Sequence, residues 1–417
     1  MSQLQLSILI PTYNRAKYLE HLLNFIKDEI YNLDCSYEIL LSNNASTDNT
    51  QSLINKYQED MKLTCFNQDE NIGALKNVKY LINKANGKYF IIVADDDLVD
   101  FELLNFAVNK IESNESVVAL YTPWQIFDYK ENKTIQLFYN APEIIIKKNN
   151  HKELCKYIIN NKIFPEIGVY KTKSIKNLLP ILYEHFFFAF KYPLEYISQG
   201  SIMFANIPFH KCLHNFNLNN ETFRHQEGWD ARFLFNVYRN SLNHYLRILN
   251  LDGDEKAKTI QMINEFIIER MHVSYNLHIG MKEYIEAYEV GSIIIGEFGI
   301  LESKYVRSKY DFKKICTFAK FDYIKRICGD NKLSKIIILS DAASKINDLE
   351  RKKILDCFKI VFDFTEYVVD IEFNNIHFSG KCIYYVFSEE EFDKKTLTSF
   401  NNESIFIEDR NLSSKFI

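Results

Sequence analysis

Glycine and proline are scarce in this sequence, with 12 and 7 residues among 417, so long flexible linkers are not expected. The eight cysteines are dispersed and form neither a CxxC pair nor a Cys/His cluster at zinc spacing, which argues against a zinc site or a disulfide framework. The formal net charge of −5 argues against a general nucleic-acid binder. These absences indicate an ordinary globular protein in a reducing compartment.

Long apolar runs are also missing. None approaches the roughly 20 residues that a membrane-spanning helix needs, and the nearest run, residues 290–301, contains Glu297. The N-terminal residues lack the basic region and the apolar stretch of a signal peptide. We therefore expect a cytoplasmic protein. Its length predicts two or three domains.

What the sequence does contain, over its first hundred residues, is an alternation of short β-branched runs with longer helical patterns. This alternation is typical of a parallel sheet covered by helices. The predicted strands are a first strand within LSILIPTYN, from residue 6 to its end at Pro11, and then YEILLSNN (37–44), LTCFNQ (63–68) and YFIIVA (89–94). A helix is predicted after each of the first three, and Gly87 is read as the stop signal of the third helix.

The rest of the chain changes character twice. Residues 101–225 are mixed, with strand candidates at 117–127, 134–140 and 200–215, and residues 226–328 are mainly helical. Strand-like runs at 335–344 and 382–388 flank a helical pattern at 347–362. We therefore predict an α/β domain over 1–225, a helical region over 226–330 and a small α/β unit over 331–417.

Three polar clusters, PTYNR, SNNASTD and ADDD, fall where predicted strands end. In open α/β sheets, ligands bind at the carboxyl ends of parallel strands. Asp95, Asp96 and Asp97 offer only oxygen ligands, which suit Mg²⁺ or Mn²⁺ bridged to a substrate phosphate. A dication would also offset the repulsion among three adjacent carboxylates. The alternative is a solvated turn before a helix that Asp100 caps.

The order of these motifs resembles the N-terminal half of family 2 glycosyltransferases with the GT-A fold. The motifs are SILIPTYNR, YEILLSNNASTDNT, ENIGALKNV and NGKYFIIVADDD; they cover about residues 4–100, and a looser likeness continues to about 225. The resemblance implies a GT-A (Rossmann-like, nucleotide-diphospho-sugar transferase) domain, a nucleotide-sugar donor, and Mn²⁺ or Mg²⁺ as cofactor.

The resemblance also assigns donor binding to particular side chains. Asn43 stands where the family usually has an Asp that hydrogen-bonds the nucleobase, and an Asn oxygen can accept the same bond. Asp95 and Asp97 correspond to the DXD pair, and Asn77 has a structural role as an equal alternative. The implied donor-binding residues are Pro11, Tyr13, Asn14, Asn43, Asn71, Asn77, Asp95, Asp96 and His214, and the implied metal ligands are Asp97 and Asp95.

An inverting transferase needs a carboxylate base that takes a proton from the acceptor hydroxyl. In the family that this sequence resembles, the base is an acidic residue that is followed by aromatic residues, a helix and a strand. The resemblance therefore implies Glu184 in LLPILYEHFFFAF as the base. His185 stands in place of the family's second acid. Glu195 and Glu166 are the alternative bases, and Glu184 as a plain surface carboxylate is the structural alternative.

After the strand FANIPF comes HKCLHN, where the resemblance implies that His214 supports the diphosphate or the metal, with Lys211 and His210 as neighbours. The segment 303–335 holds ten Lys or Arg against three Asp, which indicates either contact with an anionic membrane surface or a solvated helical face.

Taken together, these features predict a metal-dependent, inverting, non-processive hexosyl- or N-acetylhexosaminyltransferase. It would move a sugar from a nucleotide-diphosphate donor, a UDP-sugar in the first place, to a hydroxyl of a glycan or lipid-linked acceptor. The predicted setting is bacterial capsule, lipopolysaccharide or other surface-glycan assembly. The alternatives are a nucleotidyltransferase, for which PTYNRAKYLE lacks a glycine-rich loop, and a degenerate nucleotide-sugar-binding scaffold.

Overall fold

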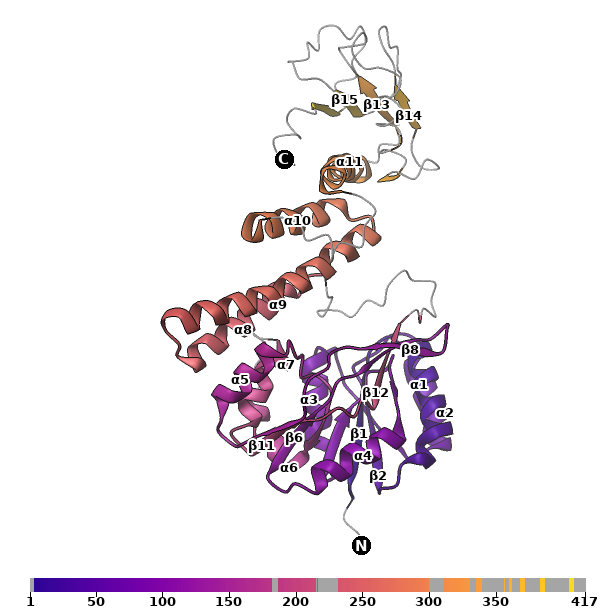
Figure 1. The fold of residues 1–417 in the computed structure, drawn as a ribbon. Helices are drawn as coiled ribbons and strands as arrows, with labels where there is room; N and C mark the ends of the chain where they lie inside the picture. Colours follow the sequence, from indigo (N-terminus) through magenta and orange to yellow (C-terminus); the bar gives the residue numbers. More distant parts are fainter. Residues whose placement is uncertain are drawn as a thin grey trace. The chain divides into compact units, whose positions relative to one another are not determined.

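The computed structural model describes residues 4–181, 187–214, 216, 232–299, 311–330, 335–339, 356, 360–361, 368–371, 383–386 and 405–408. The chain forms two compact units. The first contains residues 1–226 and 236–266, and the second contains residues 227–235 and 267–417 (Figure 1). The predicted boundaries at 225 and 330 remain predictions.

The first unit is built on an eight-stranded sheet in the order β3-β2-β1-β4-β10-β6-β11-β9. Neighbours β3, β2, β1 and β4 are parallel, as are β6 and β11, whereas β10 runs antiparallel to both β4 and β6. A second sheet has the order β5-β12-β7-β8. The mixed sheet, with helices between its strands along the chain, confirms the α/β fold class predicted for this part of the chain.

The elements of the first unit follow the predicted alternation closely up to β4. Their bounds are β1 Leu6–Thr12, α1 Ala16–Glu29, η1 Ile30–Asn32, β2 Tyr37–Asn43, α2 Thr50–Asp60, β3 Leu63–Asn67, α3 Ala74–Lys84, β4 Tyr89–Ile92, β5 Leu98–Val99, α4 Phe101–Glu112, β6 Val117–Tyr121, β7 Gln125–Asp128, β8 Lys133–Leu137, β9 Ile144–Ile146, α5 His151–Asn160, β10 Gly168–Lys171, α6 Thr172–Lys176, η2 Leu179–Ile181, α7 Phe188–Tyr196, β11 Ser201–Phe204 and β12 His210–His214. Helix α8, Phe235–Leu249, follows.

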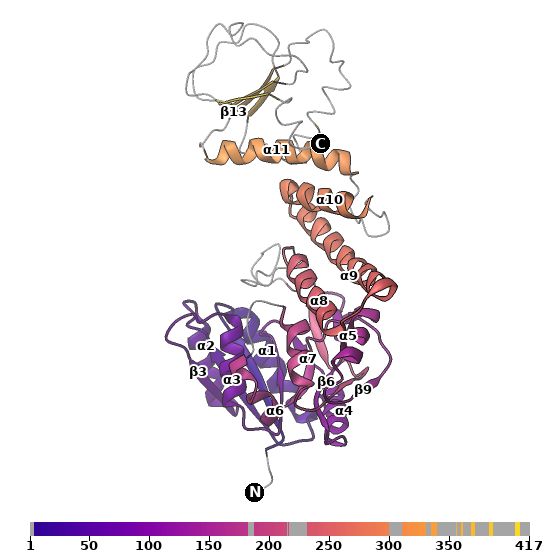
Figure 2. The same cartoon turned by 90° about the vertical axis from the view of Figure 1, so that its left-hand side faces the viewer.

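Helices cover both faces of the large sheet, as Figure 2 shows for α1 and α3. Leu6, Ile8 and Ile10 of β1 share one core with the apolar faces of α1 and α4. Because side chains alternate along a strand, Ser42 of β2 points to the opposite face from Leu41. There its hydroxyl is bound by Asn77 of α3.

Two glycines have positions that a side chain could not share. Gly73 begins α3 with a φ of +83°, a conformation that L-residues avoid. A Cβ on Gly87 would lie 2.6 Å from the backbone nitrogen of Ser7, so Gly87 allows the chain after α3 to pass close to β1. The predicted stop signal at Gly87 therefore marks a close backbone approach, while α3 itself ends at Lys84.

The strand candidate at 117–127 divides into two strands that belong to different sheets. β6 stays in the large sheet, and after Thr122–Trp124 the chain continues as β7 in the small one. In that sheet β12 pairs with both β5 and β7. This pairing brings β5, which follows the acidic turn Asp95–Asp97, beside His210 and Lys211.

The second unit contains helices and a small sheet. Helix α9 spans Gly253–Gly280 and crosses from the first unit into the second, and α10 and α11 span Tyr284–Phe298 and Phe312–Asp330. The sheet β14-β13-β15-β16 is parallel throughout, as expected for an α/β unit. Its strands are β13 Lys335–Leu339, β14 Val368–Ile371, β15 Ile383–Val386 and β16 Ile405–Glu408. The helix predicted at 347–362 lies outside the described residues, except for residues 356, 360 and 361.

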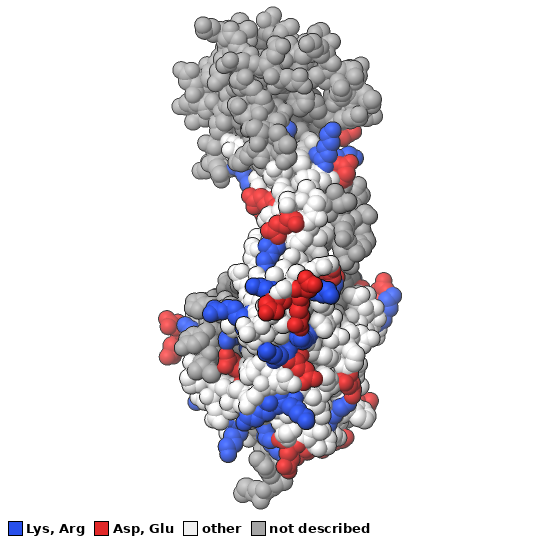
Figure 3. Space-filling model, turned by 60° about the vertical axis from the view of Figure 1, so that its left-hand side comes forward, with Lys and Arg blue, Asp and Glu red and all other residues white. Residues whose placement is uncertain are grey.

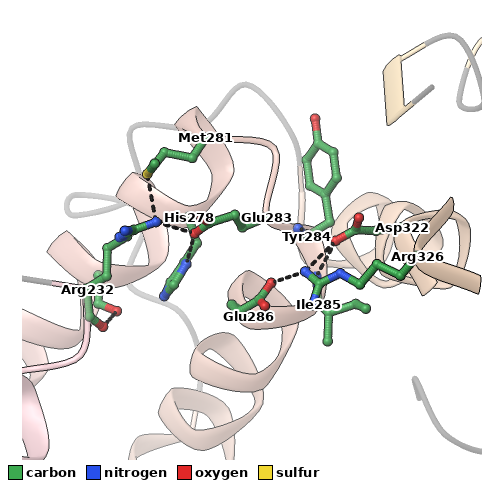
Figure 4. A network of polar contacts seen from close by, with 10 residues as sticks. Arg232, His278, Met281, Glu283, Tyr284, Ile285, Glu286, Asp322 and Arg326 are labelled. Atoms are coloured by element: carbon green, nitrogen blue, oxygen red, sulfur yellow. Dashed lines mark hydrogen bonds and ion pairs between the residues drawn. The ribbon is translucent and has the colours of Figure 1, made fainter. Parts of the chain in front are cut away.

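A polar network ties the helices of the second unit together (Figure 4). The carboxylate of Glu283, just before α10, is bound by Arg232 at 2.6 Å and by the ring nitrogen Nδ1 of His278 at 2.7 Å. Asp322 of α11 accepts hydrogen bonds from the first backbone N–H groups of α10, at 3.1 and 3.4 Å. Arg326 completes the network by pairing with Asp322.

Charges of both signs are interspersed on the face shown in Figure 3. In α11, Arg326 forms ion pairs with Glu286 and Asp322 within the protein. Contact between 303–335 and a membrane surface remains a prediction, and residues 303–310 and 331–334 lie outside the described part. None of the described helices combines the length and apolar composition needed to cross a membrane.

Candidate functional site

The candidate site lies where β1 and β4 end. In the sheet, β1 lies between β2 on one side and β4 on the other, so the carboxyl ends of β1 and β4 mark the topological switch point at which open α/β sheets bind ligands. The side chain of Thr12, the last residue of β1, donates to Asp95 Oδ2 at 2.7 Å and bridges the two strand ends.

All three aspartates of the acidic turn are buried, with 6, 4 and 9% exposure for Asp95, Asp96 and Asp97. Arg15, from the loop before α1, compensates two of them: its Nη1 lies 2.6 Å from Asp96 Oδ2 and 3.5 Å from Asp95 Oδ1. Asp100 caps α4 by accepting from the backbone N–H of Leu103. The capping alternative is therefore correct for Asp100, while the three preceding carboxylates face inward.

Burial, together with the neighbouring charge of Asp96, raises the pKa of Asp95 to about 7, although Arg15 and Thr12 favour its ionised form. Because burial is the main cause, the turn favours the neutral form of Asp95 when no cation is bound. A bound cation would favour the ionised form, which is the behaviour expected of a carboxyl group at a cation site.

Asp97 has different partners from Asp95 and Asp96. Its Oδ2 lies 3.0 Å from His210 Nε2, and its Oδ1 accepts from the backbone N–H of Leu213 at 3.2 Å. If the carboxylate is ionised, Nε2 is the protonated nitrogen of the ring. The other nitrogen, Nδ1 of His210, is buried and has no hydrogen-bond partner among the described residues.

The pairing of β12 with β5 decides which of the predicted basic residues reaches the acidic turn. His210 lies opposite Val99 and contacts Asp97, whereas His214, at the other end of β12, is exposed and lies opposite Asp128 of β7. Lys211 extends toward Asp100, with 3.5 Å between Nζ and Oδ2. Thus His210, expected only as a neighbour of His214, is the histidine that the structure brings to the turn.

The loops after β1 and β2 are tied to each other. Asn14, at a φ of +53°, accepts from the backbone N–H of Thr47 at 2.7 Å, and its own N–H donates to Ser46 Oγ at 2.9 Å. Asp48 accepts from the backbone N–H groups of Ala16, at the start of α1, and of Thr50. The structure therefore gives Asn14 and Asp48 loop-fixing roles, and Pro11 and Tyr13 lie half-buried in the same region.

The amides predicted at the donor site are engaged with neighbouring loops. Asn43 is buried; its Oδ1 accepts from Ser46 N–H at 3.1 Å and its Nδ2 donates to Gln51 at 2.8 Å. Asn71 is exposed, and its Oδ1 accepts from the N–H of Gly73 at 2.9 Å and from Asn44 Nδ2 at 2.8 Å. These bonds hold the loops after β2 and β3 in place.

Asn77, on α3, is buried against β2. It is 1% exposed, its Oδ1 accepts from Ser42 Oγ at 2.6 Å, and its Nδ2 donates to the carbonyl of Ser42 at 3.1 Å. The geometry favours the structural alternative for Asn77, in which it fixes α3 to β2.

The predicted base, Glu184, lies outside the described residues, as does His185. Of the alternatives, Glu195 forms an ion pair with Lys191 one turn earlier on α7, at 2.6 Å. Glu166 is half-buried in the segment before β10.

Sequence reasoning missed Arg15 and Thr12. One signal could have found Arg15: it is the only basic residue in the three strand-end clusters PTYNR, SNNASTD and ADDD. Three buried carboxylates require a compensating cation, so the nearest basic side chain at the same sheet edge was the natural candidate.

The residues at the turn fit a divalent cation that keeps ligands of its own. No group of three or more His, Cys, Asp or Glu in the described part forms a ready-made metal cage. Asp97 and His210 offer one carboxylate and one imidazole, and Oδ2 and Nε2 lie 3.0 Å apart, close enough for one cation to take both as ligands when Nε2 carries no proton. Such a partial set suits Mn²⁺ or Mg²⁺, which retain waters and take further oxygens from a diphosphate.

A mostly parallel sheet with polar strand ends and an acidic turn at its switch point is the arrangement at which α/β domains commonly bind their ligands. Residues 7–179, less than half of the chain, match the family model described as Glycosyl transferase family 2. Over these residues the chain is similar to family 2 of the glycosyltransferases.

Several curated proteins are similar to parts of the chain. The abequosyltransferase RfbV of Salmonella typhimurium is 29% identical over 185 residues, which are 42% of this chain and 50% of RfbV. A glycosyltransferase of Haemophilus influenzae is 22% identical over 64% of this chain and 80% of its own length. The poly(ribitol-phosphate) β-N-acetylglucosaminyltransferase TarS of Staphylococcus aureus is 28% identical over 28% of this chain and 20% of TarS. The chain thus spans about half of the first relative and a fifth of the third.

Solved structures resemble the chain loosely. The crystal structure of S. aureus TarS 1–349 in complex with UDP-GlcNAc gives a TM-score of 0.44 at 16% identity and covers 86% of this chain and 90% of that one. The mannosyltransferase PcManGT from Pyrobaculum calidifontis, in complex with GDP-Man and Mn²⁺, gives a TM-score of 0.39 at 13% identity, with 87% and 86% covered.

Proposed function

We propose that this protein is a metal-dependent, inverting, non-processive glycosyltransferase. It moves a hexosyl or N-acetylhexosaminyl group from a nucleotide-diphosphate donor, a UDP-sugar in the first place, to a hydroxyl of a glycan or lipid-linked acceptor in bacterial surface-glycan assembly. The observation that carries the proposal is the buried turn Asp95–Asp97 at the switch point of a family 2 domain, with His210 on Asp97.

Each residue of the turn has a part in donor binding. Asp97 and His210 would hold Mn²⁺ or Mg²⁺, which, when bound, stabilises the charge that develops on the leaving diphosphate. Asp95, fixed by Thr12 at the end of β1, would meet the ribose of the donor. Asn43 and Asn71, which fix the loops after β2 and β3, would border the nucleobase.

The reaction needs one further group. A carboxylate, Glu184 in this proposal, takes the proton of the acceptor hydroxyl while the hydroxyl oxygen bonds to the anomeric carbon. The bond between that carbon and the donor phosphate breaks, and the nucleoside diphosphate leaves with the bonding electrons. Attack opposite the leaving group inverts the configuration at the anomeric carbon.

The test is nucleoside diphosphate release from a panel of nucleotide sugars, with Mn²⁺ and a mixture of glycan and lipid-linked acceptors. Wild-type protein should release a diphosphate from at least one donor, and Asp97→Ala should abolish the release. Asp60→Asn is the matched control, because Asp60 is an exposed carboxylate of α2 paired with Lys27. Release that survives in Asp97→Ala, or no release from any donor, would refute the proposal.

The base is tested separately. Glu184→Gln should bind the donor nucleotide as the wild type does, and should lower the transfer rate by about 10²- to 10⁴-fold, the usual contribution of a general base. If transfer persists, the same experiment on Glu195→Gln and Glu166→Gln decides between the alternatives.

A further inference from the structure

The guanidinium of Arg15 is held on three sides at the acidic turn. Its Nη1 contacts Asp96 at 2.6 Å and Asp95 at 3.5 Å, and its Cζ lies 5.6 Å from the ring centroid of Tyr18. Tyr18 is itself fixed by an edge-to-face contact with Phe216, 5.4 Å between centroids. With 14% of its side chain exposed, Arg15 is a fixed internal charge and not a solvated one.

The charges of the turn divide between two kinds of partner. Asp95 and Asp96 share the guanidinium of Arg15, whereas Asp97 accepts from the backbone N–H of Leu213 and contacts the imidazole of His210. Three carboxylates, one guanidinium and one dication together carry no net charge. A diphosphate that approaches such a turn meets a neutral site, whereas without Arg15 it would meet an anionic one.

We propose that Arg15 is a positioning residue that assigns the roles within the acidic turn: its fixed charge offsets Asp95 and Asp96, and so leaves Asp97 as the carboxylate that a divalent cation meets. The inference rests on the proposed function, because it concerns the same cation and diphosphate. It adds a residue that touches neither the reacting sugar nor, by this assignment, the metal.

The proposal predicts effects of opposite sign on two ligands. Arg15→Gln makes the turn more negative by one charge, so the dissociation constant for Mn²⁺ alone should fall about tenfold. The same change should raise the dissociation constant for UDP, measured with saturating Mn²⁺, about tenfold. A merely structural role for Arg15 would weaken both ligands together, since both need the folded turn.

Three further variants make the test specific. Arg15→Gln with Asp96→Asn removes one charge of each sign, so both dissociation constants should return to within about threefold of wild type. Arg15→Lys keeps the charge and should largely keep Mn²⁺ affinity, although it loses the planar fork. Lys27→Gln removes an exposed charge from α1, the helix that follows Arg15; Lys27 pairs with Asp60, and its loss should change neither constant.

Free Mn²⁺ can be followed by electron paramagnetic resonance, UDP binding by titration calorimetry, and folding by thermal unfolding of each variant. If Arg15→Gln does not fold, the double variant, which removes one buried charge of each sign, carries the comparison. Weakening of both ligands in Arg15→Gln, or failure of Asp96→Asn to reverse the effects, would overturn the proposal. A wild-type protein that binds Mn²⁺ and UDP but transfers no sugar would refute the proposed function and leave the role of Arg15 standing.

Discussion

Replacing Asn77 by alanine distinguishes a residue that binds the donor from one that holds the sheet beneath it. Asn77 makes two hydrogen bonds to Ser42, at 2.6 and 3.1 Å, and both residues are buried. The variant loses both bonds and leaves the Ser42 hydroxyl hydrogen without its acceptor in a site that water does not reach. At about 1–3 kcal/mol for a buried unsatisfied group and about 1 kcal/mol for the second lost hydrogen bond, we expect the free energy of unfolding to fall by about 2–4 kcal/mol.

Equilibrium unfolding in urea measures that loss, and titration with UDP and Mn²⁺ measures donor affinity at a temperature where the variant is folded. Asn83→Ala is the matched control, because Asn83 is exposed on the same helix and its loss should change the free energy of unfolding by no more than about 0.5 kcal/mol. A variant with wild-type stability and greatly weakened UDP binding would show that the structural interpretation of Asn77 is wrong.

Three other perturbations test the candidate site and the second unit. Because the pKa of Asp95 is raised to about 7, the folded protein without metal holds this proton more tightly than the unfolded chain. The stability that Asp95 contributes should be fully present below about pH 4 and be lost as the pH rises through 7, and Asp95→Asn should remove this component from the pH dependence of thermal unfolding with a chelator. Asp48→Ala removes the acceptor for the backbone N–H groups of Ala16 and Thr50, and should cost about 1–2 kcal/mol in urea unfolding. Asp322→Ala uncaps α10 and should lower the thermal midpoint of the second unit, measured by calorimetry, because about 1–3 kcal/mol is lost.

The strands of the first unit and the polar character of their ends could be predicted because both are local properties. A β-branched run followed by a turn-forming cluster determines where a strand stops. The strands predicted at 37–44, 63–68 and 89–94 contain β2, β3 and β4, and β1 extends one residue beyond its predicted end at Pro11. The division of 117–127 between two sheets was not predictable in the same way. β6 and β7 are separated only by Thr122–Trp124, and the partner of each strand is decided by residues far along the chain.

The partners within the site were harder to predict for the same reason. His210 and His214 lie on one face of β12, about 13 Å apart along an ideal strand, and either could have reached the acidic turn. Only the register with β5, in which His210 lies opposite Val99, selects His210. Arg15 and Asp96 are 81 positions apart, and their contact depends on how the loop after β1 meets the loop after β4.

The separation of Asp97 from His210 by 113 positions has a consequence for synthesis of the protein. On a ribosome that adds roughly 5–20 residues per second, His210 is made roughly 6–20 s after Asp97. During that interval the nascent acidic turn lacks its imidazole, but Arg15 has already been made, and it can neutralise Asp95 and Asp96 as soon as they emerge. The arginine thus allows the first four strands to assemble early, while the half of the site that meets the cation is completed only when β12 is added.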